Sequence, residues 1–329
     1  MITITSLNIS GARTIEKIQD ITNNIHTDIL CMQEVRWSAD LLKEVKKMWR
    51  GEIFYAPGPS LAAGAAVLIK PGLPHDVACV HTDGGGRLVV VDLKEGSKDL
   101  RLINIYGNND EKGRKDLIRE KLSKWVSRNC IIIGDFNIIM ATEDTVNINN
   151  NKLKSDMSRQ ELLKLMSEYN LIDLWRVLNP RGRDYSRRQL VRGKLRQSRI
   201  DLVLASPGVV TEVDTVDYMP NRWSDHSLLQ VRMRGAGRPR NGGLWVLNNK
   251  ILENENFKIK INSFLNEIKY EITETEDLLK WWEGVKNRIK KLCINESKKR
   301  KWQEKQEENE LLEIIKIETK KIEENPDRN

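Results

Sequence analysis

The stretch CIIIGDFNII, residues 130–139, combines the pattern of a buried strand with polar side chains that such a strand does not need. A run of β-branched residues bounded by a glycine is typical of a core strand. Burying a charge at its end is costly unless something binds that charge. The stretch therefore predicts that Asp135 and Asn137 stand where a strand meets a pocket. The alternative is a turn in which both side chains only cap backbone groups.

Strand and helix patterns alternate on both sides of this stretch, up to about Met233. Strands are expected at 2–8, 29–33, 52–56, 65–69, 87–93, 100–106, 130–134, 200–204, 213–217 and 228–232. Helices are expected at 14–25, 39–49, 114–127 and 159–169, and a capping box from Ser158 to Glu161 would open the last one. Many strands and few amphipathic helices predict an α+β fold with packed sheets and helices outside.

Length and composition predict one large domain with an appendage, because the chain has 329 residues of which 39% are apolar. The domain is expected over 1–234, the Gly/Pro/Arg-rich segment 235–243 as a linker, and 244–329 as a helical, charged tail. No signal peptide or membrane span is expected, and four scattered cysteines indicate a reducing, intracellular location.

The net charge of +8 lies in the first 240 residues, and the segment 176–199 carries nine basic side chains against one acid. Such a density predicts a polyanionic partner. Apolar residues on both sides of the turn-like Arg192-Gly193 predict a basic hairpin over 185–199, with a solvated loop as the alternative. The candidate contacts to that polyanion are Arg187, Arg188, Arg192, Lys194, Arg196 and Ser198.

Five further stretches place polar residues at the ends of apolar strands. They are LNISG with Asn8, CMQEVRW with Glu34, INIYGNN with Tyr106, SRIDLVL with Asp201, and WSDHSLL with Asp225 and His226. Each one alone is typical of a solvated strand end or a structural cap. Their ordered combination with GDFN carries more information than any single stretch.

In this order the stretches resemble the exonuclease–endonuclease–phosphatase superfamily over residues 2–233, and most of all the apurinic-endonuclease-like endonuclease domains of LINE-type (non-LTR) retrotransposons. The resemblance implies a DNase I-like sandwich of two packed mixed β-sheets flanked by helices. The tail looks like the segment that precedes a reverse transcriptase in such proteins. Ser10 stands where repair-enzyme relatives often have an acidic residue, so the sequence does not decide whether one or two metal ions bind.

Cutting a phosphodiester requires charge neutralisation at the phosphate, an activated water and help for the leaving oxygen. Oxygen ligands suit Mg²⁺, with Mn²⁺ as a substitute. The expected metal ligands are Glu34 and Asp225, with Asn8 beside them. The expected catalytic residues are Asp135 as the base, Asn137 as its partner, His226 on the phosphate, Asp201 behind His226, and Tyr106 as a phenolic donor.

The resemblance thus predicts a metal-dependent DNA endonuclease that leaves 3′-hydroxyl ends and nicks the target of a retrotransposon. Double-stranded DNA in the nucleus is the expected substrate, the element's own RNA or ribonucleoprotein a further partner, and no membrane is involved. Three alternatives stay open: an apurinic repair endonuclease, a phosphatase acting on lipid headgroups, and a catalytically decayed binding remnant.

Overall fold

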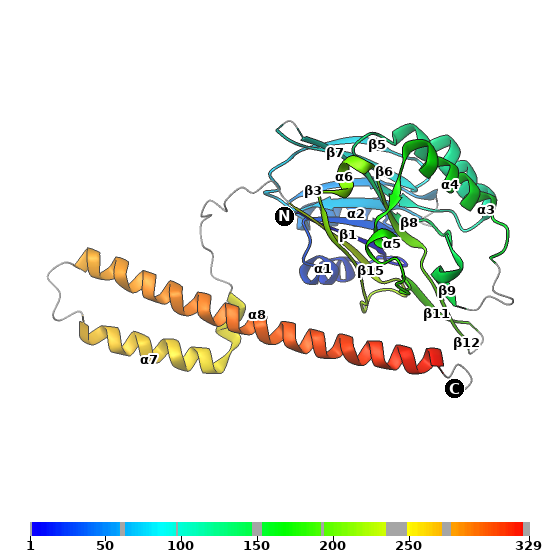
Figure 1. The fold of residues 1–329 in the computed structure, drawn as a ribbon. Coiled ribbons are helices and arrows are strands. Elements are labelled where there is room, and N and C mark those ends of the chain that lie inside the picture. Colours follow the sequence, from blue (N-terminus) through cyan, green and yellow to red (C-terminus); the bar gives the residue numbers. More distant parts are fainter. Residues whose placement is uncertain are drawn as a thin grey trace. The chain divides into compact units, whose positions relative to one another are not determined.

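The computed structural model describes residues 2–59, 63–96, 98–146, 153–191, 194–234, 249–271 and 278–324. The chain divides into two units, Met1–Gly237 and Arg238–Asn329. The first unit contains all the sheets, and the described part of the second is helical (Figure 1).

The first sheet has six strands in the order β14-β15-β1-β2-β4-β3. Their bounds are Val213–Met219 (β14), Leu228–Met233 (β15), Ile2–Asn8 (β1), Ile29–Gln33 (β2), Ala65–Ile69 (β4) and Glu52–Ala56 (β3). β1 pairs with β2 in parallel, and the other neighbours pair antiparallel. The sheet is therefore mixed, as predicted.

The second sheet also has six strands, in the order β10-β13-β8-β7-β6-β5. Their bounds are Ile172–Asp173 (β10), Asp201–Ala205 (β13), Cys130–Asp135 (β8), Lys98–Tyr106 (β7), Leu88–Glu95 (β6) and Asp76–Thr82 (β5). β7 and β8 are the parallel pair, and the other neighbours are antiparallel. The predicted sandwich of two mixed sheets is confirmed.

Helices cover the outer face of each sheet (Figure 1). α1 (Ile15–Asn24) and α2 (Ala39–Met48) pack on the first sheet. α3 (Glu111–Asp116), a π-helical turn at Leu117–Lys121, a 3₁₀ turn at Leu122–Trp125 and α4 (Met157–Tyr169) lie along the second. Smaller helical segments are Thr142–Asp144, α5 (Leu174–Leu178) and α6 (Pro207–Val210).

β8 is buried on both faces, which explains the unbroken apolar run in the sequence. Ile131 and Ile133 belong to the cluster between the two sheets, while Cys130 and Ile132 belong to the cluster beneath the helices. An alternating pattern would have left one face in water. β8 thus contributes side chains both to the core between the two sheets and to the core between the second sheet and its helices.

The parallel pairs deliver the polar side chains to one edge of the sandwich. Asn8 and Gln33 end β1 and β2, and Tyr106 stands opposite Asp135 at the end of β7 and β8. β13 starts at this edge, because Asp201 pairs with Asp135. Strands far apart in sequence therefore bring their polar ends together.

Some details differ from the sequence-based expectations. The predicted capping box at Ser158 is wrong, because Asp156 is the N-cap of α4. The Asp156 carboxylate accepts hydrogen bonds from the backbone N–H groups of Ser158 and Arg159. Ser158 is a buried residue of the first helical turn. The edge strand β5 was not predicted, because most of its side chains are exposed and its pattern is not apolar.

A third, small sheet contains the predicted basic hairpin. β11 (Arg187–Val191) and β12 (Lys194–Ser198) pair antiparallel, with Leu190 opposite Leu195, and β9 (Thr145–Val146) adds a third strand beside β12. The predicted turn at Arg192-Gly193 lies outside the described residues. A single bridge between Arg187 and His226 attaches the base of the hairpin to the edge of the sandwich.

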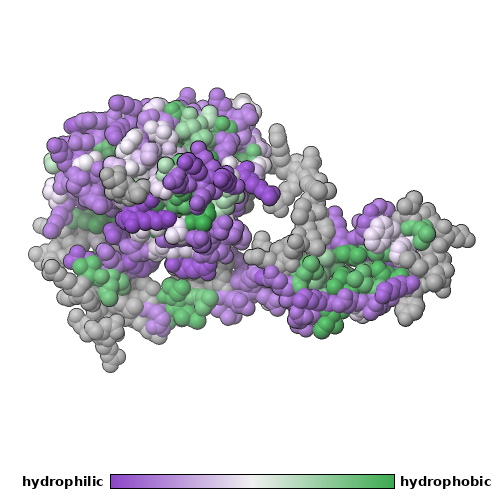
Figure 2. All heavy atoms as spheres, turned by 180° about the vertical axis from the view of Figure 1, so that it is seen from behind, coloured by the Kyte–Doolittle hydropathy of each residue, from purple (hydrophilic) through white to green (hydrophobic). Residues whose placement is uncertain are grey.

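The second unit consists of a 3₁₀ segment at Asn249–Glu253, α7 (Glu255–Glu271) and the long α8 (Leu278–Glu324), which confirms the predicted helical tail. Phe257 of α7 and Cys293 of α8 share a small buried cluster. Figure 2 shows apolar areas bordered by hydrophilic residues on this unit. The predicted linker 235–243 lies outside the described residues. No helix in the described ranges is both long and apolar enough to cross a membrane.

Gly134 explains the glycine in the opening stretch. Its φ is +145°, and a Cβ at this position would lie 2.1 Å from the backbone oxygen of Ile105 on β7. No side chain fits between two parallel strands at that distance.

We expect Gly134→Ala to lower the free energy of unfolding by about 2–4 kcal/mol, because it adds both an overlap and a strained φ. Urea unfolding followed by circular dichroism measures the change. Gly72→Ala is the matched control: its φ is +83°, but a Cβ there meets nothing within 4 Å, so strain acts alone. Equal losses in the two variants would contradict the role of the strand contact.

Candidate active site

The predicted residues Asn8, Glu34, Tyr106 and Asp135 form one hydrogen-bonded group at the edge of the sandwich. The Asn8 amide nitrogen lies 2.8 Å from Asp135 Oδ2 and 3.4 Å from Glu34 Oε2. The Tyr106 hydroxyl donates to the same Glu34 oxygen at 2.9 Å. Asn8 therefore holds two carboxylates from different sheets beside each other.

His226 and Asp201 form a second group, in which His226 Nδ1 lies 2.8 Å from Asp201 Oδ2. Both side chains are buried. The Asp201 backbone is also held, since its N–H donates to Ser186 Oγ and its carbonyl accepts from the Tyr218 hydroxyl. Asp201 Oδ1 is buried and has no hydrogen-bond partner among the described residues. A carboxylate in this position fixes the tautomer and orientation of the imidazole.

The buried charges shift each other's titration. Burial and the neighbouring Asp201 carboxylate raise the pKa of Asp135 to about 6. Burial alone would lower the pKa of His226, but Asp201, Asp135 and Asp225 outweigh it and raise the pKa to about 9. At neutral pH the site therefore holds an imidazolium beside a mostly ionised Asp135.

The GDFN stretch combines a backbone cap with side chains that face the polar edge. Asp135 Oδ1 accepts the Asn137 backbone N–H at 2.8 Å, which is the capping arrangement. The other carboxylate oxygen faces Asn8, which places it in the site. The Asn137 amide donates to the Gly107 carbonyl at 3.0 Å and is thereby aimed along the same edge.

Asp225 lies beside the dyad in the loop before β15. Its carboxylate accepts from Ser10 Oγ at 3.1 Å and from Arg187 Nε at 3.2 Å. Burial alone would raise the pKa of Asp225, but His226 and the Arg187 guanidinium outweigh it and hold the pKa below its usual range. Ser10, which stands where the sequence comparison with repair enzymes would put an acidic residue, thus donates a hydrogen bond to the Asp225 carboxylate.

Backbone strain is concentrated at this edge. Five non-glycine residues in the described part of the chain have positive φ, and four of them lie here: Ser10 (51°), Glu34 (55°), Arg36 (54°) and Asn137 (53°). Such conformations cost energy and persist where the surrounding structure enforces them. Residues with a strained backbone are thus more frequent at this edge than elsewhere in the described part of the fold.

Sequence reasoning missed two arginines. Arg36 donates to Glu34 Oε1, and its chain packs over Gly11, where a Cβ would lie 3.3 Å from Arg36 Cδ. Arg87 stacks on the Tyr106 ring, with 4.4 Å between its guanidinium carbon and the ring centroid. Arg36 lies two positions after Glu34, so its place in QEVRW was the available signal.

The basic segment 176–199 is less uniform than its composition suggests. Arg199 is buried and donates to Asp144 and Asp173, and Arg176 also donates to Asp144. These two residues are therefore structural. Arg181 and Arg183 line a hollow of about 440 Å³ beside this ion network.

The predicted DNA contacts differ in exposure and in the partners that they already have. Arg187 contacts Asp225, and Arg188 donates to Asp184, Gln197 and Ser227. Arg196 is exposed on β12, and Leu190 near the turn is 71% exposed. Ser198 pairs with Thr145 of β9, Lys194 begins β12, and Arg192 lies outside the described residues.

Two sets of residues could hold a cation. Asp135, Asp201 and His226 offer ligand atoms within 4.8 Å of one another. However, the His226–Asp201 hydrogen bond already occupies Nδ1 of the imidazole, and the raised pKa of His226 keeps the ring protonated. Glu34 and Asp225 are partly exposed carboxylates, the oxygen donors that Mg²⁺ prefers, and each now forms an ion pair with an arginine, Arg36 or Arg187.

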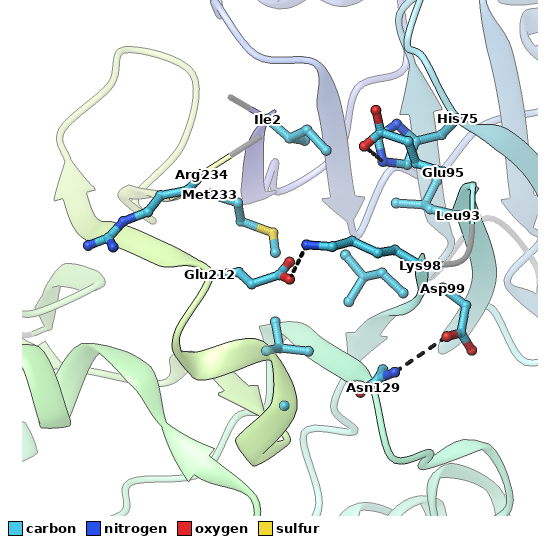
Figure 3. Close-up of a pocket in the computed structure, with 13 residues that line it drawn as sticks. Ile2, His75, Leu93, Glu95, Lys98, Asp99, Asn129, Glu212, Met233 and Arg234 are labelled. Atoms are coloured by element: carbon cyan, nitrogen blue, oxygen red, sulfur yellow. Dashed lines mark hydrogen bonds and ion pairs between the residues drawn. The ribbon is translucent and has the colours of Figure 1, made fainter. Parts of the chain in front are cut away.

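A different hollow lies at the opposite end of the strands, beside Ile2 and Met233 (Figure 3). Its volume is about 200 Å³. Lys98 reaches Glu212 at 2.7 Å, and His75 lies beside Glu95 at 3.6 Å. Asp99 accepts a hydrogen bond from Asn129, so most charged groups of this hollow already have partners, and we take the polar edge as the candidate site.

We expect Asp201→Asn to lower the pKa of His226 from about 9 by at least one unit, because the neighbouring carboxylate is the main cause that raises it. NMR titration of the His226 ring protons measures this. Tyr218→Phe is the control, since it removes a contact to the Asp201 backbone without changing charge. An unchanged pKa in Asp201→Asn would contradict the assigned dyad.

Comparison with known proteins finds relatives in sequence and in fold. A protein of the Xenopus laevis transposon TX1, an uncharacterised 149 kDa protein, is 24% identical over 300 residues, which cover 89% of this chain and 23% of the relative. The chain thus spans about a quarter of that protein's length. The apurinic (AP) endonuclease LMAP of Leishmania major has a similar fold, with a TM-score of 0.60 and 19% identity over 71% of this chain and 88% of its own.

The endonuclease domain of TRAS1, a telomere-specific non-LTR retrotransposon, also shares the fold. Its TM-score is 0.53, with 17% identity over 72% of this chain and all of that domain. Residues 5–226 match the Endonuclease/Exonuclease/phosphatase family, a range that contains every residue of the polar edge. The predicted resemblance is confirmed, and the chain belongs to the Endonuclease/Exonuclease/phosphatase family.

Proposed function

We propose that the chain is a metal-dependent DNA endonuclease that hydrolyses phosphodiester bonds, leaves 3′-hydroxyl ends and serves as the target-nicking domain of a non-LTR retrotransposon. The observation that carries this proposal is the meeting of Glu34, Asn8 and Asp135 with the His226–Asp201 dyad at one edge. A base, a cationic acid and a carboxylate for a cation are the groups that this reaction needs.

His226 would bind the scissile phosphate. Asp201 holds its Nδ1, so Nε2 is the ring nitrogen that can donate to a phosphate oxygen. With a pKa of about 9, the imidazolium is charged at neutral pH and stabilises the charge that develops on the phosphate. Asp201 acts through His226 and does not touch the substrate.

Asp135 would orient and deprotonate the attacking water. A pKa of about 6 places this carboxylate close to the operating pH, where a general base works best. Asn8 and the Asn137 backbone each donate to one Asp135 oxygen, so the carboxylate cannot rotate. The Asn137 amide would hold the phosphate or water in line.

Glu34 and Asp225 would hold Mg²⁺, or Mn²⁺ in its place. The bound cation supplies charge neutralisation at the phosphate and at the leaving oxygen. Tyr106 keeps its proton, because burial and Glu34 raise the pKa of its hydroxyl well above the usual value. It can therefore act as a donor that positions Glu34 or the phosphate.

Double-stranded DNA is the proposed substrate because the basic hairpin stands directly beside the dyad. Arg188 donates its backbone N–H to the Asp225 carbonyl, and Arg187 is bridged to His226. An exposed Arg196 and an exposed Leu190 lie on the same hairpin. Arginines bind phosphates or enter a narrow minor groove, and apolar side chains can wedge between base steps.

The retrotransposon role rests on the likeness to the TX1 protein, which extends past the endonuclease domain into the helical tail. The proposed division is a domain over 1–234, a linker at 235–243 and a tail over 244–329. Such a role implies action in the nucleus and a further partner in the element's own RNA. A repair AP endonuclease is the second candidate, supported by the likeness to LMAP. Strong cutting of abasic duplex with little cutting of intact duplex would favour it.

We expect the protein to nick supercoiled plasmid with Mg²⁺ or Mn²⁺ and to be inactive in EDTA. Glu34→Gln and His226→Ala should each slow nicking at least about 100-fold, since they remove a charge at the transition state. Gel assays of initial rates measure this. Asp99→Asn makes the same change as Glu34→Gln at the opposite end of the sandwich and should leave the rate unchanged. Wild-type rates in either site variant would refute the proposal.

We also expect Arg196→Ser to flatten the salt dependence of duplex binding, lowering the log–log slope by about 0.9, because one phosphate contact is lost. Fluorescence anisotropy in EDTA measures binding, and sequencing of the nicked plasmid maps the cut sites, which should shift. Lys98→Ser, at the far end of β7, is the control. If the slope and the cut sites both stay the same, the hairpin is ordinary surface.

A further inference from the structure

The charges of α8 are separated along its length, although the segment from Asn241 to the end is neutral in sum. Residues 286–305 carry nine basic side chains against two acids, whereas 306–324 carry three against seven. A helix whose charges only served solubility would not need this separation, since mixed pairs at i, i+4 are favourable. The basic part is therefore a candidate for binding a polyanion.

Some of these cations are already used within the unit, and others are not. Lys286 pairs with Glu283, Arg288 with Glu271, and Arg300 with Glu304. Lys291, Lys298 and Lys299 are exposed and form no ion pair with any residue that the structure describes. Their charges are left for a partner.

The helical repeat places a basic stripe opposite the packed face of α8. At 100° per residue, Lys291, Lys298, Trp302 and Lys305 fall within about 60° of each other and span about 21 Å. Cys293 and Ile289, which pack in the cluster with α7, lie on the other side. Figure 1 shows α7 beside the N-terminal half of α8 only, so the end of the stripe extends past the helix pair.

Trp302 is the one aromatic residue of the basic stripe. It is 64% exposed and stands between lysines on the same stripe. A large aromatic side chain exposed among cations is costly for a helix that only faces water. It offers a flat surface on which an unstacked base can lie, and this combination of lysines and an aromatic ring is how proteins bind single strands.

We propose that this stripe, Lys291, Lys298, Trp302 and Lys305 with the adjacent Lys299, binds single-stranded DNA. Lys291, Lys298 and Lys299 contact the phosphates, and Trp302 stacks on a base. Base-paired duplex offers the lysines its phosphates but offers Trp302 no free base face, so the exposed ring favours the single strand. The choice of DNA over RNA rests on the proposed function, because a nick frees a strand end that can unpair.

Fluorescence anisotropy of the full chain with a labelled 20-nucleotide dT strand tests this, with a U strand and a duplex as parallel arms. Binding is measured in EDTA, so it does not depend on catalysis. Lys291→Ser/Lys298→Ser/Lys299→Ser should weaken dT binding about tenfold or more and lower the salt slope by about two. Trp302→Ala should weaken it about tenfold, and Trp302→Phe should restore most of the binding.

The matched control is Lys258→Ser/Lys260→Ser/Lys269→Ser, which removes the same charge from exposed positions of α7. It should bind as the wild type does. All variants should keep their helix content by circular dichroism and nick plasmid at the wild-type rate. A failure of the proposed nicking activity can thus be told apart from a failure of the proposed strand binding, because the two are measured separately.

Three results would overturn the proposal. Unchanged dT binding in the α8 variants, or an equal loss in the α7 control, would show that the stripe is a solvated face. Dependence on the lysines without dependence on Trp302 would leave only a positive patch, such as an import signal for an acidic receptor. Much tighter binding of the U strand would assign the stripe to RNA.

Discussion

The site depends on a buried amide bridge that fixes how the two sheets sit against each other. Asn104 of β7 donates to the carbonyls of Met32 and Ala66 in the opposite sheet, at 3.0 and 2.9 Å. Gln33 of β2 donates back to Asn104 at 2.7 Å. An apolar interface alone is non-directional, whereas buried amides must find their partners. Sliding one sheet over the other would leave these groups unpaired.

The bridge lies directly beneath the catalytic edge. Gln33 precedes Glu34, and Asn104 is two residues before Tyr106 on the same strand. The contacts from Tyr106 to Glu34 and from Asn8 to Asp135 both cross between the sheets. A shift of one residue would turn each side chain to the other face of its strand. The polar bridge in the core and the polar site at the edge are therefore set by the same register.

Charge balance explains why so many carboxylates can gather at this edge. Asp135 and Asp201 are both buried, and the imidazolium of His226 lies within reach of both. Arg36 and Arg187 meet the charges of Glu34 and Asp225 at the more exposed side. Each carboxylate thus has a cation or several N–H and O–H donors, as buried or half-buried charges require. The edge is polar throughout, and each negative charge lies near a positive one.

Local pattern in the sequence was enough to predict the sheets, the main helices, the basic hairpin and the polar residues at the strand ends. Continuous β-branched runs identify strands buried on both faces, and an Asp or His directly before or after such a run is visible without coordinates. The edge strand β5 escaped because the exposure of its side chains depends on neighbours distant in sequence. The N-cap at Asp156 escaped because Asp156 and Ser158 are both residue types that cap helices, and the sequence does not say which one does so. The pattern also could not separate the buried Arg199 from the exposed Arg196, since both belong to one basic run.

Only the tertiary structure decided which atoms meet. Asn8 and Asp135 are 127 residues apart, and their 2.8 Å contact exists because two sheets stack in one register. The pairing of Arg36 with Glu34 and of Arg187 with Asp225, and the raised pKa values of Asp135 and His226, follow from distance and burial. Sequence alone thus determined which residues could reach the edge, because periodicity is a local property. Their mutual geometry came from packing, because electrostatic and hydrogen-bond energies depend on separations that no local pattern contains.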